Sequence, residues 1–273
     1  MSNHDNPIRV GSEQNQVKQC CATLYESDWT RFLLGDSFHP GGLQLTGQLG
    51  RMLGLNPASR VLDAACGKGT SAIFLAKEFG CEVFGIDYGE QNVEAARSLA
   101  RTEQLESRVQ FERSDAESLP FSDESFDAVI CECAFCTFPD KASAAREFLR
   151  VLRRGGQVGI SDLTRQDVLS EELHGLLAWI ACIADAHTIE DYVAFLRGAG
   201  FSKGSIKERN DVLEEMATQV RLKLLGAEIM TGLNKLQLPG IDLGGAKRMA
   251  NSAMTAVKQG QLGYALICAT KPD

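Results

Sequence analysis

The sequence lacks any uninterrupted apolar run of about eighteen residues, the length that a transmembrane helix needs, so we expect no membrane span. Residues 1–18 are polar and lack the apolar core of a secretory signal. An excess of basic residues is also missing, because 36 Asp and Glu outnumber 28 Lys and Arg and the formal net charge is −8. Since phosphate-rich partners need a basic face, we expect neither nucleic-acid nor membrane partners. These absences indicate a cytoplasmic protein.

Cysteine, by contrast, is plentiful: the chain has nine. An odd number in a reducing compartment predicts free thiols, metal ligands or catalytic groups rather than a disulfide framework. Free cysteines are also often buried as small apolar residues, and the pattern allows both uses.

Short apolar runs alternate with amphipathic stretches from residue 60 onward. We predict strands at 60–65, 81–87, 109–113, 126–132, 157–162, 201–208 and 262–269, and helices at 70–79, 90–103, 141–152, 169–185, 189–199, 212–235 and up to about 257. This alternation predicts βαβ units, and hence an α/β fold with a mainly parallel seven-stranded sheet and helices on both faces.

Two regions flank this alternation. A mostly helical segment at 20–53 comes first, after a flexible N-terminus at 1–18. The late helices should lie over the carboxyl ends of the strands, where open α/β sheets bind ligands. A Gly-rich loop is predicted at 239–245, and the long helix at 212–235 is predicted to be a pocket lid or a homodimer contact.

A glycine-containing loop follows the first predicted strand. Asp63 ends that strand, and Gly67 and Gly69 allow a tight turn into the next helix. The second strand ends at Asp87, where a carboxylate is placed to accept hydrogen bonds from ribose hydroxyls. A dinucleotide site would be disfavoured, because Ala72 replaces the third glycine and Asp63 would repel a pyrophosphate. The same acid can reach the cationic end of S-adenosyl-L-methionine, which we therefore predict as the cofactor.

Five segments resemble successive motifs of the class I S-adenosylmethionine-dependent methyltransferases: VLDAACGKG at 61–69, GID at 85–87, SDAE at 114–117, SFDAV at 125–129 and RVLRRGG at 150–156. The resemblance covers about residues 45–165. It implies a Rossmann-like fold and one methyltransferase domain at 19–273. Within that domain the core is 45–165, a helical cap is 19–44, and an acceptor or lid region with helical insertions is 166–260.

The resemblance also implies roles in cofactor binding. The loop around Asp63 would surround the methionine part, Asp87 would bind the ribose, Tyr88 would lie along the adenosine, and Asp115 would hold the adenine edge. The alternative roles are helix capping for Asp87, packing for Tyr88 and turn formation for Asp115. The full set of candidate cofactor residues is Asp63, Ala64, Cys66, Gly67, Gly69, Asp87, Tyr88, Asn92, Asp115, Ala116 and Cys131.

The acceptor is a small molecule whose class depends on the residues near the transfer point. An oxygen or nitrogen nucleophile usually needs a general base, for which Glu132, His39, His174, His187 and Asp162 are candidates. A soft nucleophile needs none, and thiolates select soft, thiophilic centres. The candidate catalytic residues are therefore Cys182, Cys21, Cys20, Glu132, Cys133 and Cys136.

Three segments resemble the arsenite methyltransferases: the Cys20-Cys21 pair, FPDK at 138–141, and CIADAHTIEDY at 182–192 followed by AGF at 199–201. The resemblance implies that Cys182, with one or both of Cys20 and Cys21, binds trivalent arsenic as thiolates. Three alternatives stay open: methylation of sulfide, methanethiol or another small thiol; carbon, oxygen or nitrogen methylation with Glu132 or a histidine as base; and a non-catalytic cofactor-binding or metalloid-sensing protein.

Overall fold

The computed structural model describes residues 18, 39–166, 169, 173, 183, 185–202, 204–233 and 242–273. Most of the predicted helical segment at 20–53 and of the helix at 169–185 lies outside these residues. The described strands are β1 (Arg60–Ala64), β2 (Glu82–Asp87), β3 (Val109–Arg113), β4 (Phe126–Glu132), β5 (Leu152–Arg165), β6 (Ile206–Glu208) and β7 (Leu262–Thr270). The described helices are α3 (Gly42–Met52), α4 (Thr70–Phe79), α5 (Glu90–Thr102), α6 (Lys141–Val151), α8 (Ile189–Ala199), α9 (Asn210–Gly232) and α10 (Leu243–Lys258), with a 3₁₀ turn at Phe135–Thr137.

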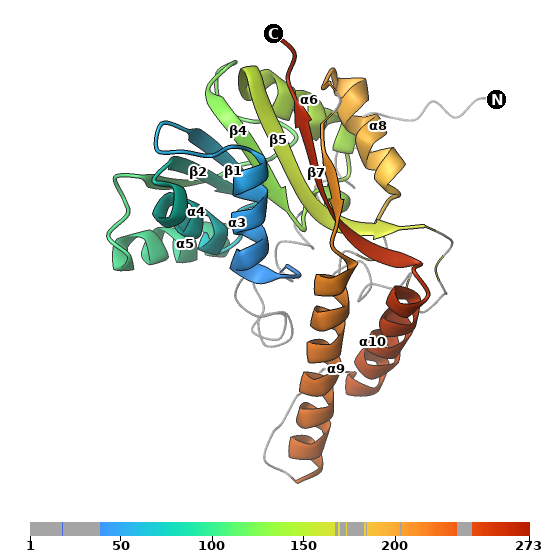
Figure 1. The fold of residues 1–273 in the computed structure, drawn as a ribbon. Coiled ribbons are helices and arrows are strands. Elements are labelled where there is room, and N and C mark those ends of the chain that lie inside the picture. Colours follow the sequence, from blue (N-terminus) through green and yellow to red (C-terminus); the bar gives the residue numbers. More distant parts are fainter. Residues whose placement is uncertain are drawn as a thin grey trace, which may run out of the picture.

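All seven strands form one sheet in the order β3-β2-β1-β4-β5-β7-β6 (Figure 1). The first five are parallel, and β7 runs antiparallel to both β5 and β6. The predicted mainly parallel seven-stranded α/β sheet is thus confirmed. Central strands of such a sheet are covered on both faces, which explains why β1 and β4 read as nearly continuous apolar runs.

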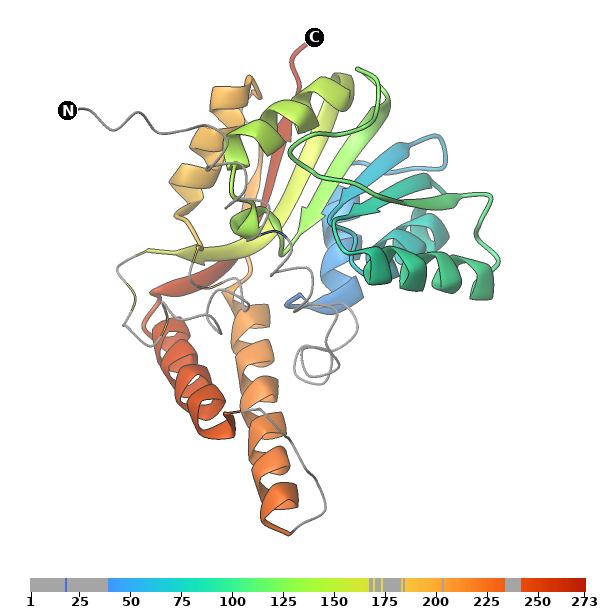
Figure 2. The ribbon, with the colours of Figure 1, turned by 180° about the vertical axis from the view of Figure 1, so that it is seen from behind.

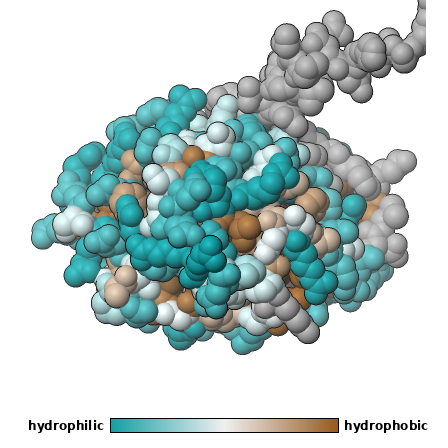
Figure 3. Space-filling view, turned by 90° about the horizontal axis from the view of Figure 1, so that it is seen from above, coloured by the Kyte–Doolittle hydropathy of each residue, from teal (hydrophilic) through white to brown (hydrophobic). Residues whose placement is uncertain are grey.

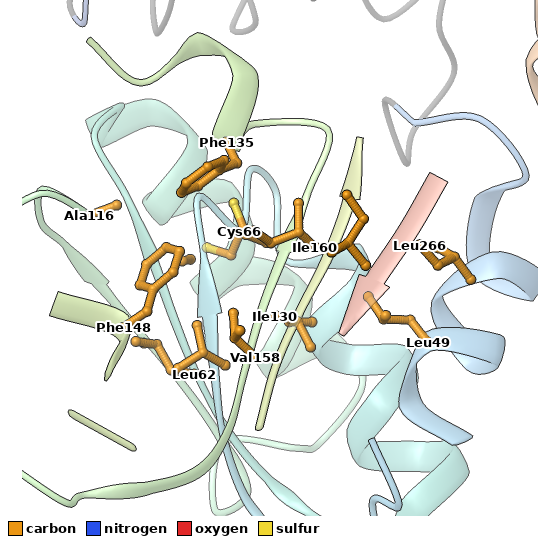
Figure 4. Close-up of a cluster of buried hydrophobic side chains, with 14 of the residues drawn as sticks. Leu49, Leu62, Cys66, Ala116, Ile130, Phe135, Phe148, Val158, Ile160 and Leu266 are labelled. Atoms are coloured by element: carbon orange, nitrogen blue, oxygen red, sulfur yellow. The ribbon is translucent and has the colours of Figure 1, made fainter. Parts of the chain in front are cut away.

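Helices cover the two faces of the sheet in separate groups. α3 packs against α4 and α4 against α5, whereas α6 packs against α8. α3 lies in front of the sheet in Figure 1, and α6 lies in front of it in the opposite view of Figure 2. Figure 4 shows the core between them, with Leu49 of α3, Ile130 of β4 and Phe148 of α6 all at most 1% exposed. Each such side chain contributes about 1.5–3 kcal/mol by leaving water.

α9 and α10 form a helical hairpin that projects from the body of the molecule (Figures 1 and 2). A small apolar cluster joins them, made of Leu224, Ala246 and Ala250 with Val220 and Leu243 at its edge. The surface seen from the opposite end of the molecule is mainly hydrophilic (Figure 3). No helix of the described ranges is both long and apolar enough to cross a membrane.

Several predicted boundaries were wrong. The strand predicted at 157–162 is longer, because β5 already pairs with β4 at Leu152 and still pairs with β7 at Arg165. The Gly-rich loop predicted to extend to residue 245 ends earlier, because Asp242 accepts a hydrogen bond from the backbone N–H of Gly245 and starts α10 at Leu243. The strand predicted at 201–208 shrinks to β6, because only an isolated bridge joins Ser202 to Thr270 before Ile206. The capping acid and the lack of partner strand pairing outweighed local composition at the loop and at β6.

Phe111 of β3 packs directly against two glycines, Gly85 of β2 and Gly69 at the start of α4. A Cβ built on Gly85 would lie 2.5 Å from Phe111 Cδ1 and 2.9 Å from Cys66 Sγ. A Cβ on Gly69, whose φ is +79°, would lie 2.6 Å from Phe111 Cζ. Real Cβ atoms do not approach so closely, so both glycines are required for β2, β3 and the loop to pack together.

We therefore expect Gly85→Ala to lower the free energy of unfolding by about 1–3 kcal/mol, measured by urea denaturation, because the methyl group overpacks the core. Gly198→Ala is the matched control, since no atom lies within 4 Å of the added Cβ in α8. The control should keep or slightly raise the stability. Equal stability of the two variants would contradict the packing of Phe111 on Gly85.

Candidate functional site

Acidic side chains mark the ends of three adjacent strands. Asp63 lies near the end of β1, Asp87 ends β2 and Glu132 ends β4. β1 pairs in parallel with both β2 and β4, so these ends meet at one edge of the sheet. All three residues line one cavity, whose empty space is about 1100 Å³ including the part open to solvent. Open α/β sheets bind their ligands at this edge.

The cavity gathers most of the predicted site residues that the structure describes. Those that line it are Asp63, Cys66, Gly67, Asp87, Tyr88, Asn92, Asp115, Ala116, Glu132 and Cys133. Four others are absent from its lining: Ala64, Gly69, Cys131 and Cys136. The predicted ligands Cys20, Cys21 and Cys182, and the predicted base candidate His174, lie outside the described residues.

The loop between β1 and α4 turns through three residues with left-handed backbone angles. These are Ala65 at φ 64°, Gly67 at φ 53° and Gly69 at φ 79°. A left-handed alanine is uncommon and stores strain, which is typical of functional loops. Gly69 caps α4 without a side-chain hydrogen bond. The first N–H groups of the helix therefore need partners from outside the helix.

Asp87 holds this loop in place from the neighbouring strand. Its Oδ2 accepts a hydrogen bond from Gly67 N at 2.9 Å, and its Oδ1 accepts from Gly89 N at 2.8 Å and from Asn92 Nδ2 at 3.1 Å. The carboxylate thus ties the loop after β1 to the start of α5. The Oδ1 atom of Asn92 is buried and has no hydrogen-bond partner.

Asp63 is the least satisfied charge of the cavity. The side chain is 2% exposed, and its Oδ2 is buried without a hydrogen-bond partner in the part of the chain that the structure describes. Burial, together with the negative charges of Glu132 and Asp87, raises the pKa of Asp63 well above its usual range. An unpaired buried acid is costly, and a cationic group placed beside it would remove that cost.

Hydroxyl groups and one histidine surround Glu132. Its Oε2 accepts hydrogen bonds from Ser71 Oγ at 2.7 Å and from Thr46 Oγ1 at 3.0 Å, and Ser161 Oγ lies 3.4 Å from Oε1. His39 Nε2 lies 3.6 Å from Glu132 Oε2, and both side chains are at most 5% exposed. The other ring nitrogen, Nδ1, lies 3.2 Å from the carbonyl oxygen of Pro40. The structure thus brings together His39 and Glu132, which the sequence suggested only separately.

The cysteines after β4 have different surroundings. Cys131 and Cys136 are fully buried, whereas Cys133 is half-buried, lines the cavity and has a left-handed φ of 51°. Burial, with the charges of Asp162 and Asp63, raises the pKa of Cys131 well above its usual range, so this thiol stays protonated. Cys66 lines the cavity as Cys133 does, and burial also raises the pKa of its thiol. Within the described residues, no three His, Cys, Asp or Glu side chains are grouped as ligands of a metal ion.

Two further base candidates lie away from the cavity lining. The carboxylate of Asp162 is fully buried and accepts hydrogen bonds from the backbone N–H groups of Cys136 and Leu163. Asp162 therefore orients the turn after β4. The side chain of His187 is 24% exposed, and burial lowers the pKa of its imidazole.

Lys18 is a cavity residue that sequence reasoning missed. Its Nζ lies 2.7 Å from Asp115 Oδ2 and 2.5 Å from Glu117 Oε2, and its side chain is 12% exposed. The contact spans 97 residues of sequence, and no motif or periodicity around Lys18 signals it. The predicted adenine-edge acid Asp115 therefore shares the positive charge of Lys18 with Glu117.

A family model described as a methyltransferase domain matches residues 55–209 of the chain. The methyltransferase GfsG of Streptomyces halstedii is 29% identical over 240 residues, which are 87% of this chain and 83% of that protein. The 27-O-demethylrifamycin SV methyltransferase of Amycolatopsis mediterranei (strain S699) is 29% identical over 236 residues, 84% of each chain. A solved structure of Haemonchus contortus phosphoethanolamine N-methyltransferase 2, with phosphomonomethylethanolamine and S-adenosylhomocysteine, has a TM-score of 0.78 and 20% identity. That likeness covers 94% of this chain and 60% of the other.

The raised pKa of Asp63 predicts how stability depends on pH. An acid whose folded pKa lies above its unfolded value of about 4 stabilises the fold fully below pH 4. That contribution is lost as pH rises through the folded pKa, at about 1.4 kcal/mol per pH unit for one proton. We expect Asp63→Asn to remove this loss, so that the variant gains stability relative to the wild type as pH rises.

Urea denaturation of the ligand-free protein between pH 4 and pH 9 measures the effect. Comparison with the wild type separates Asp63 from surface acids such as Asp140, whose pKa is lowered and whose effect has the opposite sign. Exposed Glu106, changed to Gln, is the control and should follow the wild type. A constant stability difference across this pH range would show that Asp63 is ionised in the empty site.

Proposed function

We propose that this methyltransferase methylates an oxygen or nitrogen atom of its acceptor. The chain belongs to the methyltransferase domain family and is an S-adenosylmethionine-dependent methyltransferase of small molecules. The observation that carries the proposal is the buried pair of His39 and Glu132 in the wall of the cofactor cavity. A hydroxyl group or an amine that carries a proton releases it when it is methylated, and this pair can take it up.

The cavity fits the charge of S-adenosylmethionine. When bound, this cofactor supplies an electrophilic methyl group on a sulfonium and also carries an ammonium group. We assign the unpaired Oδ2 of Asp63 to the ammonium group and the unpaired Oδ1 of Asn92 to a donor on the ribose side. Asp87 would hold the ribose, Tyr88 would lie along the adenosine, and Asp115 with Ala116 would meet the adenine edge. Four acids line the cavity against two lysines, and one of these, Lys18, pairs with Asp115, so the acids around Asp63 favour a cationic group there.

The hydrogen bonds of His39 prepare it to accept one proton. We assign the ring proton to Nδ1, which lies 3.2 Å from Pro40 O, so that Nε2 beside Glu132 is the basic nitrogen. When Nε2 takes the acceptor's proton, the Glu132 carboxylate would stabilise the new imidazolium by its negative charge. Ser71 and Thr46 fix that carboxylate through hydroxyl donors.

The names of the relatives support such acceptors. The relative from Amycolatopsis mediterranei is named for methyl transfer to an oxygen of demethylrifamycin. The similar Haemonchus contortus structure is named for methyl transfer to the nitrogen of phosphoethanolamine. Because both share the fold with this chain, an oxygen or nitrogen acceptor fits the same framework.

A soft acceptor is the second candidate function, and Cys133 favours it. Its side chain lines the cavity beside Glu132, where a thiolate could hold a thiophilic centre. Cys133 would then lie next to the acceptor. The acceptor would be trivalent arsenic, bound by Cys182 with one or both of Cys20 and Cys21, or a small thiol or sulfide. Since those three cysteines lie outside the described residues, the test of this candidate is chemical.

An acceptor screen with purified protein separates the two candidates. The panel contains small phenols, alcohols and amines on one side, and arsenite with thiol, sulfide and methanethiol on the other. Formation of S-adenosylhomocysteine is measured. We expect turnover with a phenol, alcohol or amine; turnover confined to arsenite, sulfide or thiols would contradict the proposal.

Two variants test the roles of the residues. His39→Gln should lower kcat by about 10²–10⁴-fold, because the base is lost, while the affinity for S-adenosylmethionine stays nearly unchanged. Cys133→Ser should keep most of the activity. The reverse pattern, with loss in Cys133→Ser and activity in His39→Gln, would favour the soft acceptor.

Asp63→Asn tests the cofactor assignment separately. We expect it to weaken S-adenosylmethionine binding at least about tenfold by calorimetry, because the variant cannot balance the ammonium charge. Wild-type binding should release protons, since the cation lowers the pKa of Asp63, and the variant should release fewer. Glu106→Gln is the control. Unchanged affinity and proton release in Asp63→Asn would overturn the assignment.

A further inference from the structure

The outer face of α9 carries a stripe of exposed apolar side chains. Leu222, Leu225, Ile229 and Leu233 are 62%, 48%, 54% and 58% exposed. Spacings of three, four and four residues place them on one face of the helix. Soluble monomers rarely expose so continuous an apolar surface, and those that do usually bind something there.

Neither α10 nor the cofactor cavity accounts for this stripe. The buried residues Leu224 and Ala227 lie on the opposite face of α9, and Leu224 belongs to the cluster that α10 completes. No residue of α9 lines the cofactor cavity. The stripe lies on the part of the hairpin that extends away from the body of the molecule (Figures 1 and 2). Its role is therefore separate from methyl transfer.

Two opposite charges flank the stripe on the same side, seven residues or two helical turns apart. Arg221 donates from Nε to Asn251 Oδ1 at 2.8 Å, and Glu228 pairs with Lys247 at 2.5 Å. These contacts with α10 hold both side chains beside the stripe. The terminal guanidinium nitrogens of Arg221 and the second carboxylate oxygen of Glu228 are further binding groups in the same place.

We propose that two copies of this chain form a dimer through the outer faces of α9, crossing antiparallel near Leu225. A twofold axis at this point places Leu222 of each copy within about one residue's rise, about 1.5 Å, of the level of Ile229 of the other. It places Arg221 of each copy equally near the level of Glu228 of the other, within reach of these long side chains, so the charge pair is formed twice. Gly226 lies at the centre of the crossing, and no atom lies within 4 Å of a Cβ built on it, so the helices can approach closely.

Charge selects a second copy over an anionic lipid surface. The chain has a formal net charge of −8, which opposes binding to anionic lipids. Amphipathic helices that bind such lipids carry basic residues beside the apolar face, whereas Arg221 and Glu228 place both signs of charge along one side of this stripe. A pair of opposite charges with twofold spacing is self-complementary, and this matches a copy of itself.

Sedimentation velocity and light scattering on the full chain test the dimer over a range of concentrations. We expect a dimer for the wild type, and at least about a 30-fold rise in the dissociation constant for Leu225→Glu. Met230→Glu is the matched control: Met230 is an exposed apolar residue of the same helix, 42% exposed, but lies off the stripe. The control should remain a dimer. Circular dichroism and S-adenosylmethionine affinity establish that each variant is folded.

A charge exchange tests the register without removing apolar surface. Arg221→Glu and Glu228→Arg should each weaken the dimer, because like charges then meet across the twofold axis. Because Glu228 pairs with Lys247 within one copy, the exchange is made with K247E as well. The variant R221E with E228R and K247E should recover most of the wild-type affinity. If it is as weak as R221E alone, the antiparallel register is overturned.

Two further outcomes would overturn the dimer itself. One is a wild type that stays monomeric at 100 μM, a concentration at which weak homodimers of about micromolar affinity are formed. The other is binding of the wild type, and not of Leu225→Glu, to vesicles of phosphatidylcholine and phosphatidylglycerol. Vesicle binding would assign the stripe to a lipid surface.

Discussion

The repulsion among Asp63, Asp87 and Glu132 at one edge of the sheet is the constraint on which the site depends. Because β1 pairs in parallel with β2 and β4, these carboxylates lie close together at the carboxyl ends of the three strands. Buried carboxylates are poorly screened by solvent, so each needs its own compensating partner. The fold supplies these partners unevenly. Asp87 accepts hydrogen bonds from backbone N–H groups and Glu132 from hydroxyl groups beside His39, whereas the Oδ2 atom of Asp63 has no hydrogen-bond partner among the described residues.

This uneven compensation explains why the cavity suits a cationic cofactor. A site whose acids were all paired would gain little from a bound cation. A site whose acids were all unpaired would not stay folded, because several buried charges would be uncompensated. Among the described residues, the Oδ2 atom of Asp63 is a buried carboxylate oxygen without a hydrogen-bond partner, and the charges of Glu132 and Asp87 act on it. The energy that a ligand recovers is thus concentrated at Asp63, next to the loop of Gly67 and Gly69.

The sequence predicted those parts of the molecule that are encoded locally. The loop after β1 and the acid after β2 follow from strand ends, glycines and short spacing. The hydroxyl shell of Glu132 was out of reach, because Thr46 and Glu132 are 86 residues apart and neither lies in a recognisable motif with the other. Lys18 was missed for the same reason. Alternation along β4 also gave no means to tell buried Cys131 from cavity-lining Cys133, because a left-handed turn at Cys133 ends the alternation.

The same negative charge that attracts a sulfonium acts against thiolates. In Cys66 and Cys131, the charge of Asp63 adds to burial in raising the pKa, so these thiols are kept protonated. A soft-metal centre needs thiolates and would have to form them against this field. The proposed proton transfer makes no such demand, because a proton received by His39 would lie beside the Glu132 carboxylate, with Nε2 3.6 Å from Oε2. The oxygen or nitrogen acceptor that we propose therefore needs no thiolate in this cavity.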